Sequence, residues 1–328
     1  NRSHEPLPLE DEKPREAHTL KPGTQRLYQK EFQAAFEDWS GKEITTITRT
    51  MVENRHAQIS ERAKARANLA MRILRALFNF AIGKYEDAEG QPVVRDNPVQ
   101  RLSAVRAWNR VDRRRTLIRP HQLPAWFDAV EALRENPSGK ARTTADWLEF
   151  LILTGCRRAE SLSLSWADVD LNARFFRLPD TKNHQVHELP LSDRLHELLL
   201  TRYPGPGATG PVFEGSRPEQ PLIEPRRWID RVAEQSGVPF TAHDLRRTFA
   251  TTAESLDLTA YAIKRLLNHT SGANGDVTSG YLIIDVERLR VPMQRITDAI
   301  LTAAGRRGPK SDVIPIQARL DHAGHSAS

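Results

Sequence analysis

A break in the helical periodicity divides this sequence into two parts. From residue 24 to residue 81, apolar residues recur every three or four positions, the spacing of one face of an α-helix. Gly90, Pro92 and Pro98 then end the pattern, because proline lacks an amide hydrogen and glycine lowers helix stability. The chain of 328 residues also exceeds the usual length of one domain, about 100 to 200 residues. We therefore predict two domains.

Composition and periodicity set the predicted boundaries. Residues 1–22 hold four prolines among mixed charges and too few apolar side chains to offset the entropy of ordering, so we expect a linker or the remnant of an arm. Three or four helices are predicted within residues 23–100. Residues 101–119 are interpreted as a basic interdomain linker, residues 120–304 as a second domain and residues 305–328 as a flexible tail.

The second domain is predicted to be mainly helical with a small β-sheet. Helical patterns cover residues 121–135 and 142–153, whereas residues 174–178 and 186–191 are typical of strands joined by turn-forming residues. The two strands predict a hairpin with Lys182 at its tip. The fold class is therefore mainly α with a small β-sheet, and the second domain is α+β.

Composition excludes several classes of protein. Cys156 is the single cysteine, which rules out an internal disulfide and a cysteine-based zinc site and suits a reducing cytosol. No run of 18 apolar residues occurs, so no membrane-spanning helix is expected. The 48 lysines and arginines exceed the 42 aspartates and glutamates, and the net charge of +6 favours a polyanionic partner.

Cations concentrate in two segments. The first is on the polar faces of the N-terminal helices, where a solvated surface is the alternative interpretation. The second is the predicted linker, whose seven arginines have Asp112 as their one acidic neighbour, so we expect this segment to lie against phosphate. The candidate DNA-contacting residues are Arg62, Lys64, Arg66, Arg106, Arg110, Arg113, Arg114 and Arg115.

A candidate anion site begins at a capping box. Thr241 and Asp244 have the spacing in which each side chain caps the other's backbone, which predicts a helix starting at Ala242. His243 and Arg246 then share a face of the first turn, where free amide groups and the helix dipole favour an anion. This arrangement predicts a phosphate site. A histidine near a helix cap and a surface ion pair are the structural alternative.

Two further motifs carry candidate residues. Thr-Gly-Cys-Arg-Arg-Ala-Glu places Arg157 just past a helix end, with Glu160 able to orient its guanidinium group for bidentate contacts to an oxyanion. Leu-Leu-Asn-His ends another helix at His269, and Tyr281 follows twelve residues later. Taken alone, an arginine at a helix end and a lone histidine are more often structural.

In order and spacing, these motifs resemble those of the tyrosine recombinase (phage integrase) family. That family has T-G-x-R-x-x-E, a hairpin lysine, H-x-L-R, a histidine after Leu-Gly or Leu-Asn, and a tyrosine, and all five occur here in that order. The resemblance covers residues 24–300, and its sharpest part is the string at residues 243–251. The segment Gly-Tyr-Leu-Ile-Ile-Asp-Val-Glu-Arg-Leu-Arg is most similar to integrases of satellite phages and integrative islands.

The resemblance implies a role for each matching residue. It implies a helical core DNA-binding domain at residues 23–100 and a catalytic domain at residues 120–304 that together clamp the duplex. It assigns Arg157 and Arg246 as phosphate clamps, Lys182 as general acid, His243 and His269 as proton-handling or orienting groups, Tyr281 as nucleophile and Glu160 as an orienting residue. No metal and no cofactor are expected.

The implied activity is DNA strand exchange through a 3′-phosphotyrosyl intermediate, in the integration or excision of a mobile element. A tyrosine hydroxyl with a pKa of about 10 needs nearby cations to act as a nucleophile, and the arginines and histidines are of the right type. The expected partners are double-stranded DNA attachment sites, a homotetramer on DNA and accessory DNA-bending proteins. The expected location is the cytoplasm, at the bacterial nucleoid, and an arm-binding segment is expected before Asn1.

The sequence departs from the family in the spacing between His269 and Tyr281, which is longer than the commonest one. Tyr261 precedes the histidine inside a helical pattern and is rejected as the nucleophile. Arg158 and Arg247 adjoin the two predicted clamps, so the choice between neighbours rests on motif register. The alternatives for function are a type IB topoisomerase, which relaxes DNA with similar residues, and a DNA-binding regulator that has lost catalysis.

Overall fold

A computed structural model describes residue 20 and residues 22–112, 115–179, 186–217, 219–223, 225–268 and 286–307. The chain divides into two compact units, residues 1–114 and residues 115–328. Within the described residues, no helix is both long enough and apolar enough to cross a membrane. Each unit has its own hydrophobic core.

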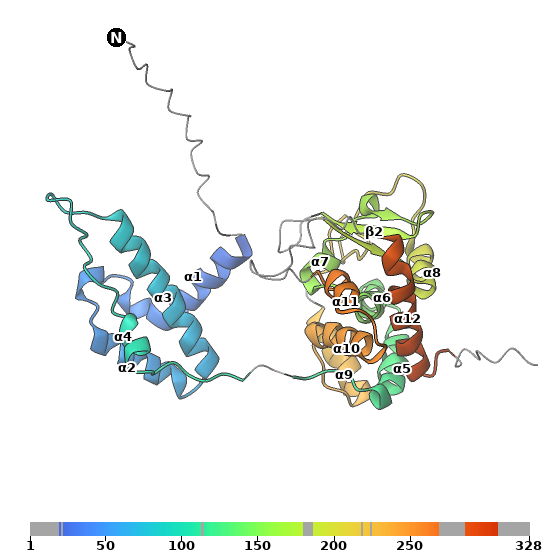
Figure 1. Cartoon of the computed structure of the whole chain (residues 1–328), viewed down its shortest axis with the longest axis horizontal. Coiled ribbons are helices and arrows are strands. Elements are labelled where there is room, and N and C mark those ends of the chain that lie inside the picture. The colour runs from blue at the N-terminus through green and yellow to red at the C-terminus, as the bar shows by residue number, and fades with distance from the viewer. Residues whose placement is uncertain are drawn as a thin grey trace, which may run out of the picture. The chain divides into compact units, whose positions relative to one another are not determined.

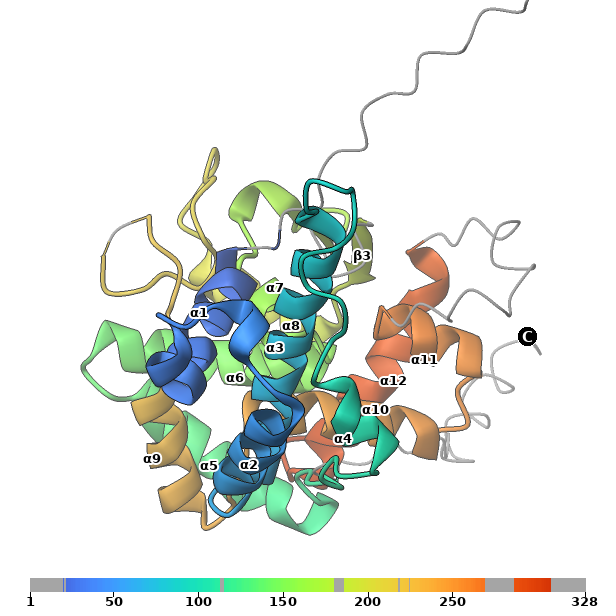
Figure 2. The same ribbon diagram turned by 90° about the vertical axis from the view of Figure 1, so that its left-hand side faces the viewer.

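The first unit is a small helical bundle (Figure 1). Its helices are α1 (Pro22–Phe36), α2 (Arg49–Ser60), α3 (Lys64–Lys84) and α4 (Gln100–Ala104), with short 3-10 turns at Glu37–Trp39 and Ile44–Thr46. The long helix α3 contacts both α1 and α2, and all three are seen side by side in Figure 2. Phe36, Val52 and Met71 are fully buried where these helices meet. The apolar periodicity of residues 24–81 therefore forms one continuous core.

The predicted linker at residues 101–119 is packed at both of its ends. Leu102 belongs to α4 and lies in the core of the first unit. Asn109 is held to α3 because its amide donates to Asn68 Oδ1 at 3.1 Å and its carbonyl accepts from Asn68 Nδ2 at 2.8 Å. Ile118 is buried in the core of the second unit. The contacts of Leu102, Asn109 and Ile118 therefore make the exposed part of the linker shorter than its arginine content suggested.

The second unit surrounds one buried helix with other helices and a small sheet. Its elements are α5 (Leu123–Arg134), α6 (Gly139–Thr154), α7 (Arg158–Leu162), β1 (Val169–Asp170), β2 (Phe175–Leu178), β3 (His187–Pro190), α8 (Asp193–Arg202), α9 (Arg226–Ser236), α10 (Ala242–Ser255), α11 (Ala260–Leu266) and α12 (Glu287–Ala303), with 3-10 turns at Pro120–Gln122 and Trp166–Asp168. Helix α6 contacts α5, α8, α9, α10 and α12. From Thr143 to Thr154 every residue of α6 is buried, including Asp146 and Glu149, so the helix lies at the centre of the unit.

The strands form an antiparallel sheet in the order β1-β2-β3. Phe176 on β2 pairs with Leu189 on β3, and both are buried, whereas the next pair, Arg177 and Glu188, is exposed. This alternation places one face of the sheet on the core. Helix α12 packs against β3 and runs down to α5 (Figure 1). The predicted fold class, mainly α with a small sheet, is confirmed.

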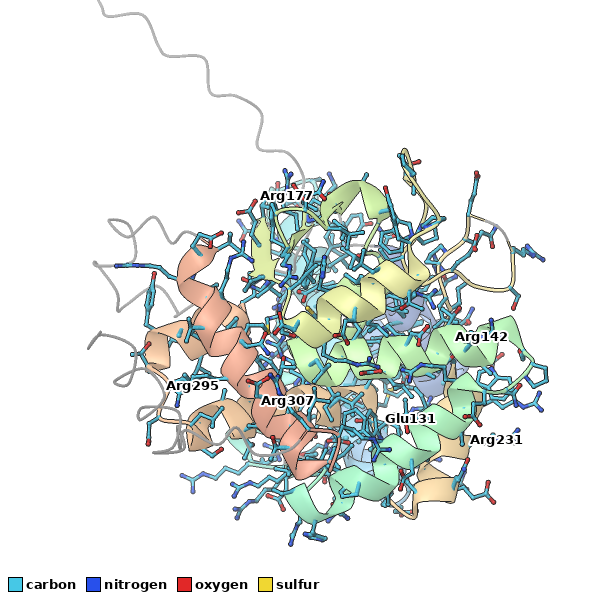
Figure 3. All side chains as sticks on the ribbon, turned by 90° about the vertical axis from the view of Figure 1, so that its right-hand side faces the viewer. Glu131, Arg142, Arg177, Arg231, Arg295 and Arg307 are labelled. Carbon is cyan, nitrogen blue, oxygen red and sulfur yellow. The ribbon has the colours of Figure 1, made fainter. Side chains whose placement is uncertain are left out.

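Buried ion pairs hold α6 to its neighbours on the side shown in Figure 3. Asp146 accepts from Arg134 at 2.7 Å and from Arg202 at 2.6 Å. Glu149 is bound by Arg134 and also accepts from Arg194 at 2.6 Å. Burial lowers the pKa of Arg134, but Glu149 and Asp146 together outweigh burial and raise it; the hydrogen bond to Glu149 raises the pKa of Arg194. These contacts fix the positions of α5, α6 and α8 relative to one another.

Candidate active site

A cavity of about 660 Å³ brings together residues from four helices of the second unit. Arg157 and His243 line it, and so does Arg246. Trp147 and Phe240 give it an apolar wall. Residues that are up to 99 positions apart in the sequence thus share one concave site, of a size that holds part of a larger ligand.

Helix α10 begins as its sequence predicts. The backbone amide and the hydroxyl of Thr241 donate to Asp244 Oδ2 at 2.9 and 2.8 Å. This capping box starts the helix at Ala242, as predicted. It also fixes the first turn, so that His243 and Arg246 are presented to the same cavity.

Arg246 is a buried cation held by backbone carbonyls. Its Nη1 donates to the carbonyl of Gly155 at 2.6 Å and its Nη2 to the carbonyl of Leu267 at 2.5 Å. Burial lowers its pKa, and the neighbouring Arg157 lowers it further. Among the described residues no carboxylate is hydrogen-bonded to Arg246, so its charge remains available to an anion in the cavity.

Arg157 is oriented by a buried carboxylate. Its Nη1 donates to Glu160 Oε1 at 2.7 Å, and its backbone amide donates to Glu160 Oε2 at 3.2 Å. Its Nη2 donates to the carbonyl of Asn268 at 3.2 Å. The carbonyls of Leu267 and Asn268, just past the end of α11, therefore hold the two arginines side by side.

A glycine makes the close approach of α6 and α10 possible. Gly155 ends α6 in the left-handed conformation, with φ of 65°. A Cβ atom at this position would lie 2.5 Å from Cδ1 of Phe249 on α10. The absence of a side chain therefore lets Phe249 pack against the backbone and brings Arg246 to the carbonyl of Gly155.

His243 is exposed at the cavity. Partial desolvation lowers its pKa, and the positive charges of Arg247 and Arg246 lower it further. The imidazole is therefore neutral over more of the range around pH 6.5 than a free histidine. A neutral imidazole can donate one hydrogen bond and accept another, as a proton-handling group must.

The neighbouring residues Arg246 and Arg247 on α10 make different contacts. Arg246 enters the cavity, whereas Arg247 Nη1 donates to Asp244 Oδ1 at 2.9 Å and does not line the cavity. The choice of Arg246 by motif register therefore agrees with the geometry. At the other pair, both Arg157 and Arg158 line the cavity, and the contact with Glu160 distinguishes Arg157.

Several predicted site residues lie outside the described residues. These are Lys182, His269 and Tyr281 of the predicted catalytic set, and Arg113 and Arg114 of the predicted DNA-contacting set. Lys182 falls in residues 180–185, and His269 and Tyr281 fall in residues 269–285, two ranges that are not described.

The remaining predicted DNA contacts are exposed on the first unit and the linker. Arg62 and Arg66 line a second cavity of about 420 Å³, where Arg66 Nε donates to Glu31 Oε2 at 3.0 Å. Lys64 opens α3. Arg106, Arg110 and Arg115 are exposed on the linker. A phosphate contact by Arg66 therefore competes with an acidic neighbour, whereas the linker arginines are open to solvent.

The sequence did not reveal His187 as part of this region. It is buried on β3, and its Nε2 donates to the carbonyl of Arg265, on α11, at 2.7 Å. Burial lowers its pKa to about 4. The residues next to His187, Val186 and Glu188, give no signal for such a contact, since its acceptor is a backbone carbonyl 78 residues away.

Comparison with known proteins identifies the family. A sequence profile of the phage integrase family matches residues 117–282. The prophage integrase IntF of Escherichia coli (strain K12) is 30% identical over 243 residues, which cover 72% of this chain and 49% of IntF. The tyrosine recombinase XerA of Saccharolobus solfataricus is 28% identical over 127 residues, covering 37% of this chain and 40% of XerA. The chain belongs to the phage integrase family.

Solved structures agree in fold. A lambda integrase dimer bound to a COC′ core site superposes with a TM-score of 0.60 at 22% identity, covering 77% of this chain and 90% of that one. The XerH site-specific recombinase in a post-cleavage complex gives a TM-score of 0.58 at 17% identity, covering 86% and 78%. The chain spans less than half the length of IntF and of XerA.

Proposed function

We propose that this protein is a site-specific DNA recombinase that cuts and rejoins strands during the integration or excision of a mobile element. The observation that carries the proposal is the buried, carbonyl-held Arg246 next to the Glu160-oriented Arg157, with His243 at the same cavity. Two adjacent guanidinium groups are suited to the paired oxygens of a phosphodiester. Family membership supports the same function.

In the proposed reaction, the Tyr281 oxygen attacks the phosphorus of one DNA strand. The bond from phosphorus to the 5′-oxygen breaks, and Lys182 gives that oxygen its proton. Arg157 and Arg246 stabilise the charge that develops on the non-bridging oxygens, while His243 and His269 orient the phosphate or accept the proton that the Tyr281 hydroxyl loses. The product is a 3′-phosphotyrosyl linkage and a free 5′-hydroxyl. Attack by the 5′-hydroxyl of a second strand reverses these steps and completes strand exchange.

The proposed substrate is a double-stranded DNA attachment site, to which the helical unit and the catalytic unit both bind. Among the structural neighbours, lambda integrase is seen as a dimer on a core site and as a tetramer on a Holliday junction. By analogy we propose a homotetramer on DNA, assisted by accessory DNA-bending proteins. The site of action would be the cytoplasm, at the bacterial nucleoid.

A suicide DNA substrate tests the chemistry. Tyr281→Phe removes the nucleophile, so no DNA-linked protein should form on any substrate. Lys182→Ala keeps the nucleophile but lacks the acid, so expulsion of a 5′-alkoxide, whose conjugate acid is about as weak an acid as water, becomes slow. A bridging 5′-sulfur leaves as a thiolate with a pKa of about 8.5 and needs no proton. The sulfur substrate should therefore restore cleavage to Lys182→Ala and not to Tyr281→Phe.

The rates of covalent complex formation by both variants, on oxygen-bridged and sulfur-bridged DNA, decide the assignment. If sulfur restores neither variant, Lys182 is not the general acid. If Tyr281→Phe still forms the adduct, another residue is the nucleophile.

We expect the chemical step to proceed without a metal ion, because the two arginines already place fixed positive charge at the cavity. Covalent complex formation should continue in excess EDTA at the rate measured without it. A strict requirement for magnesium in single-turnover cleavage would contradict this expectation.

A further inference from the structure

The end of the arginine-rich linker is hydrogen-bonded to the helix that carries His243 and Arg246. The hydroxyl of Thr116 donates to Asp244 Oδ1 at 2.7 Å. Two residues further on, the amide of Ile118 donates to the hydroxyl of Thr248 at 3.0 Å. These contacts join the last residues of the linker to the first two turns of α10.

Asp244 takes part in two structures at once. Its Oδ2 atom accepts from the backbone amide and the hydroxyl of Thr241, and its Oδ1 atom accepts from Thr116 and from Arg247. Burial raises its pKa, but the hydrogen bonds from Thr116 and Thr241 outweigh burial and lower it. A buried, ionised carboxylate with every contact made at short distance is a stiff connection.

The contact at Thr116 is not needed to anchor the linker or to cap the helix. Ile118 is buried in the core and fixes the chain by apolar packing. The capping box forms between Thr241 and Asp244 and does not involve Thr116. Thr116 is an exposed residue, and Arg115 immediately before it is exposed as well. The hydrogen bond to Asp244 therefore connects the part of the linker that solvent and ligands reach with the first turn of the catalytic helix.

We propose that Thr116 and Asp244 are positioning residues, which make the placement of His243 and Arg246 depend on how the linker lies on DNA. This inference rests on the proposed function. Binding of phosphate by the exposed arginines fixes the path of the linker, and the Thr116 hydroxyl passes that constraint to Asp244. His243 immediately precedes Asp244, and Arg246 follows Asp244 by two positions. A small shift of the start of α10 therefore moves both side chains toward or away from the phosphate.

The matched pair Thr116→Val and Thr116→Ser separates the hydroxyl from the shape of the side chain. Valine keeps the branched shape and cannot donate, whereas serine keeps the donor. With saturating suicide DNA, Thr116→Val should form the covalent complex slower by a factor on the order of ten, the size of a typical coupling between two sites. Thr116→Ser should remain within about twofold of the wild type, since its donor is retained. The affinity for DNA should be unchanged in both, and the thermal midpoint should fall only in Thr116→Val, because the buried Asp244 carboxylate loses one hydrogen bond there.

A double-variant cycle tests whether the effect comes from the linker. Arg115→Gln should slow cleavage at saturating DNA in the wild-type background, and it should have no further effect in the Thr116→Val background. Equal rates for Thr116→Val and the wild type would overturn the inference. So would equal slowing by valine and serine, or independent, multiplying effects of Arg115→Gln and Thr116→Val.

A readout that does not depend on cleavage distinguishes this inference from the proposed function. In the Tyr281→Phe background, DNA should slow hydrogen exchange of the amides in the first turns of α10, and Thr116→Val should abolish this protection while Thr116→Ser retains it. Protection that is the same in all three proteins would overturn the inference even if the wild type cleaves. A wild type that shows the protection and forms no adduct would count against the proposed function alone.

Discussion

The Arg246 guanidinium group is held in position by backbone carbonyls rather than by side chains. A guanidinium group has five N–H donors, and the carbonyls of Gly155 and Leu267 take two of them. The others remain for a ligand in the cavity. A carbonyl oxygen holds the guanidinium group without neutralising its charge, whereas a carboxylate would neutralise it. This explains how a cation that is only 6% exposed can serve an anionic substrate.

Arg246→Lys should therefore slow covalent complex formation strongly, because a lysine cannot make both carbonyl contacts and also reach the phosphate. We expect a loss of about 10²- to 10³-fold, as for removal of one oxyanion donor. Single-turnover rates on suicide DNA measure it. Arg142→Lys is the control, since Arg142 is an exposed arginine on α6 (Figure 3). A similar rate for both variants would show that Arg246 does not act on the phosphate.

His187 predicts a pH dependence of stability. Its pKa is about 4 in the folded protein and about 6.5 when unfolded, so the unfolded chain binds more protons between these values. Its contribution is constant above pH 6.5, and stability is lost as pH falls from 6.5 towards 4. At pH 5 this amounts to about 2 kcal/mol, at ~1.36 kcal/mol per pH unit.

In His187→Gln, the part of the stability loss at low pH that comes from protonation of His187 should be absent. The measurement is the free energy of unfolding of both proteins in urea at pH 7.5 and pH 5, and the difference between the two pH values should be smaller in the variant. The same pH dependence in both proteins would show that another group titrates.

At the scale of elements, the site depends on where α6 ends and α10 begins. Both boundaries are local features of sequence: a glycine in the left-handed conformation ends one helix, and a capping box starts the other. The contact between them is tertiary, since Phe249 of α10 occupies the space beside Gly155.

Gly155→Ala should therefore lower the free energy of unfolding by more than the cost of the left-handed backbone conformation alone. Gly237 ends α9 with nearly the same φ of 68°, and no atom lies within 4 Å of a Cβ built there. Gly237→Ala is thus a matched control that costs only the left-handed conformation, about 1–2 kcal/mol. Gly155→Ala adds a clash with Phe249 and should cost at least about 1 kcal/mol more, in the range of overpacked cores. Equal losses in urea unfolding would show that α10 moves aside freely.

At the scale of the whole molecule, two units are joined by a short, basic segment. The exposed arginines of this segment are not accompanied by asparagine or glutamine side chains that could read bases, apart from Asn109, whose side-chain Nδ2 donates to Ser60 Oγ at 2.7 Å. Such arginines are suited to the DNA backbone, whose contacts position a protein without specifying sequence.

Neutralising Arg110 and Arg115 together should therefore weaken binding to all DNA sequences alike. The slope of the logarithm of affinity against the logarithm of salt concentration should fall by roughly two units, since about one counterion is released for each phosphate contact. Titrations of an attachment site and of unrelated DNA over a range of salt concentrations measure this. A loss confined to one sequence would show that these arginines read bases.

The amino-acid sequence alone determined the local structure of this protein. The capping box predicted the start of α10 at Ala242, and turn-forming residues predicted the strand pair of the small sheet. The break after residue 90 and the apolar side chains on both sides of it indicated two units. Such features depend on residues within a few positions of one another, and the sequence shows these directly.

Motif order singled out Arg157, His243 and Arg246, but the tertiary structure decided how they are held. It placed Arg246 rather than Arg247 in the cavity, and it gave Asp244 a second partner 128 residues away. The acceptors for the two arginines are backbone carbonyls, which every residue has, so no residue type marks them in a sequence. Only the packing of α6, α10 and α11 brings those carbonyls together, because contacts between distant segments depend on the whole fold.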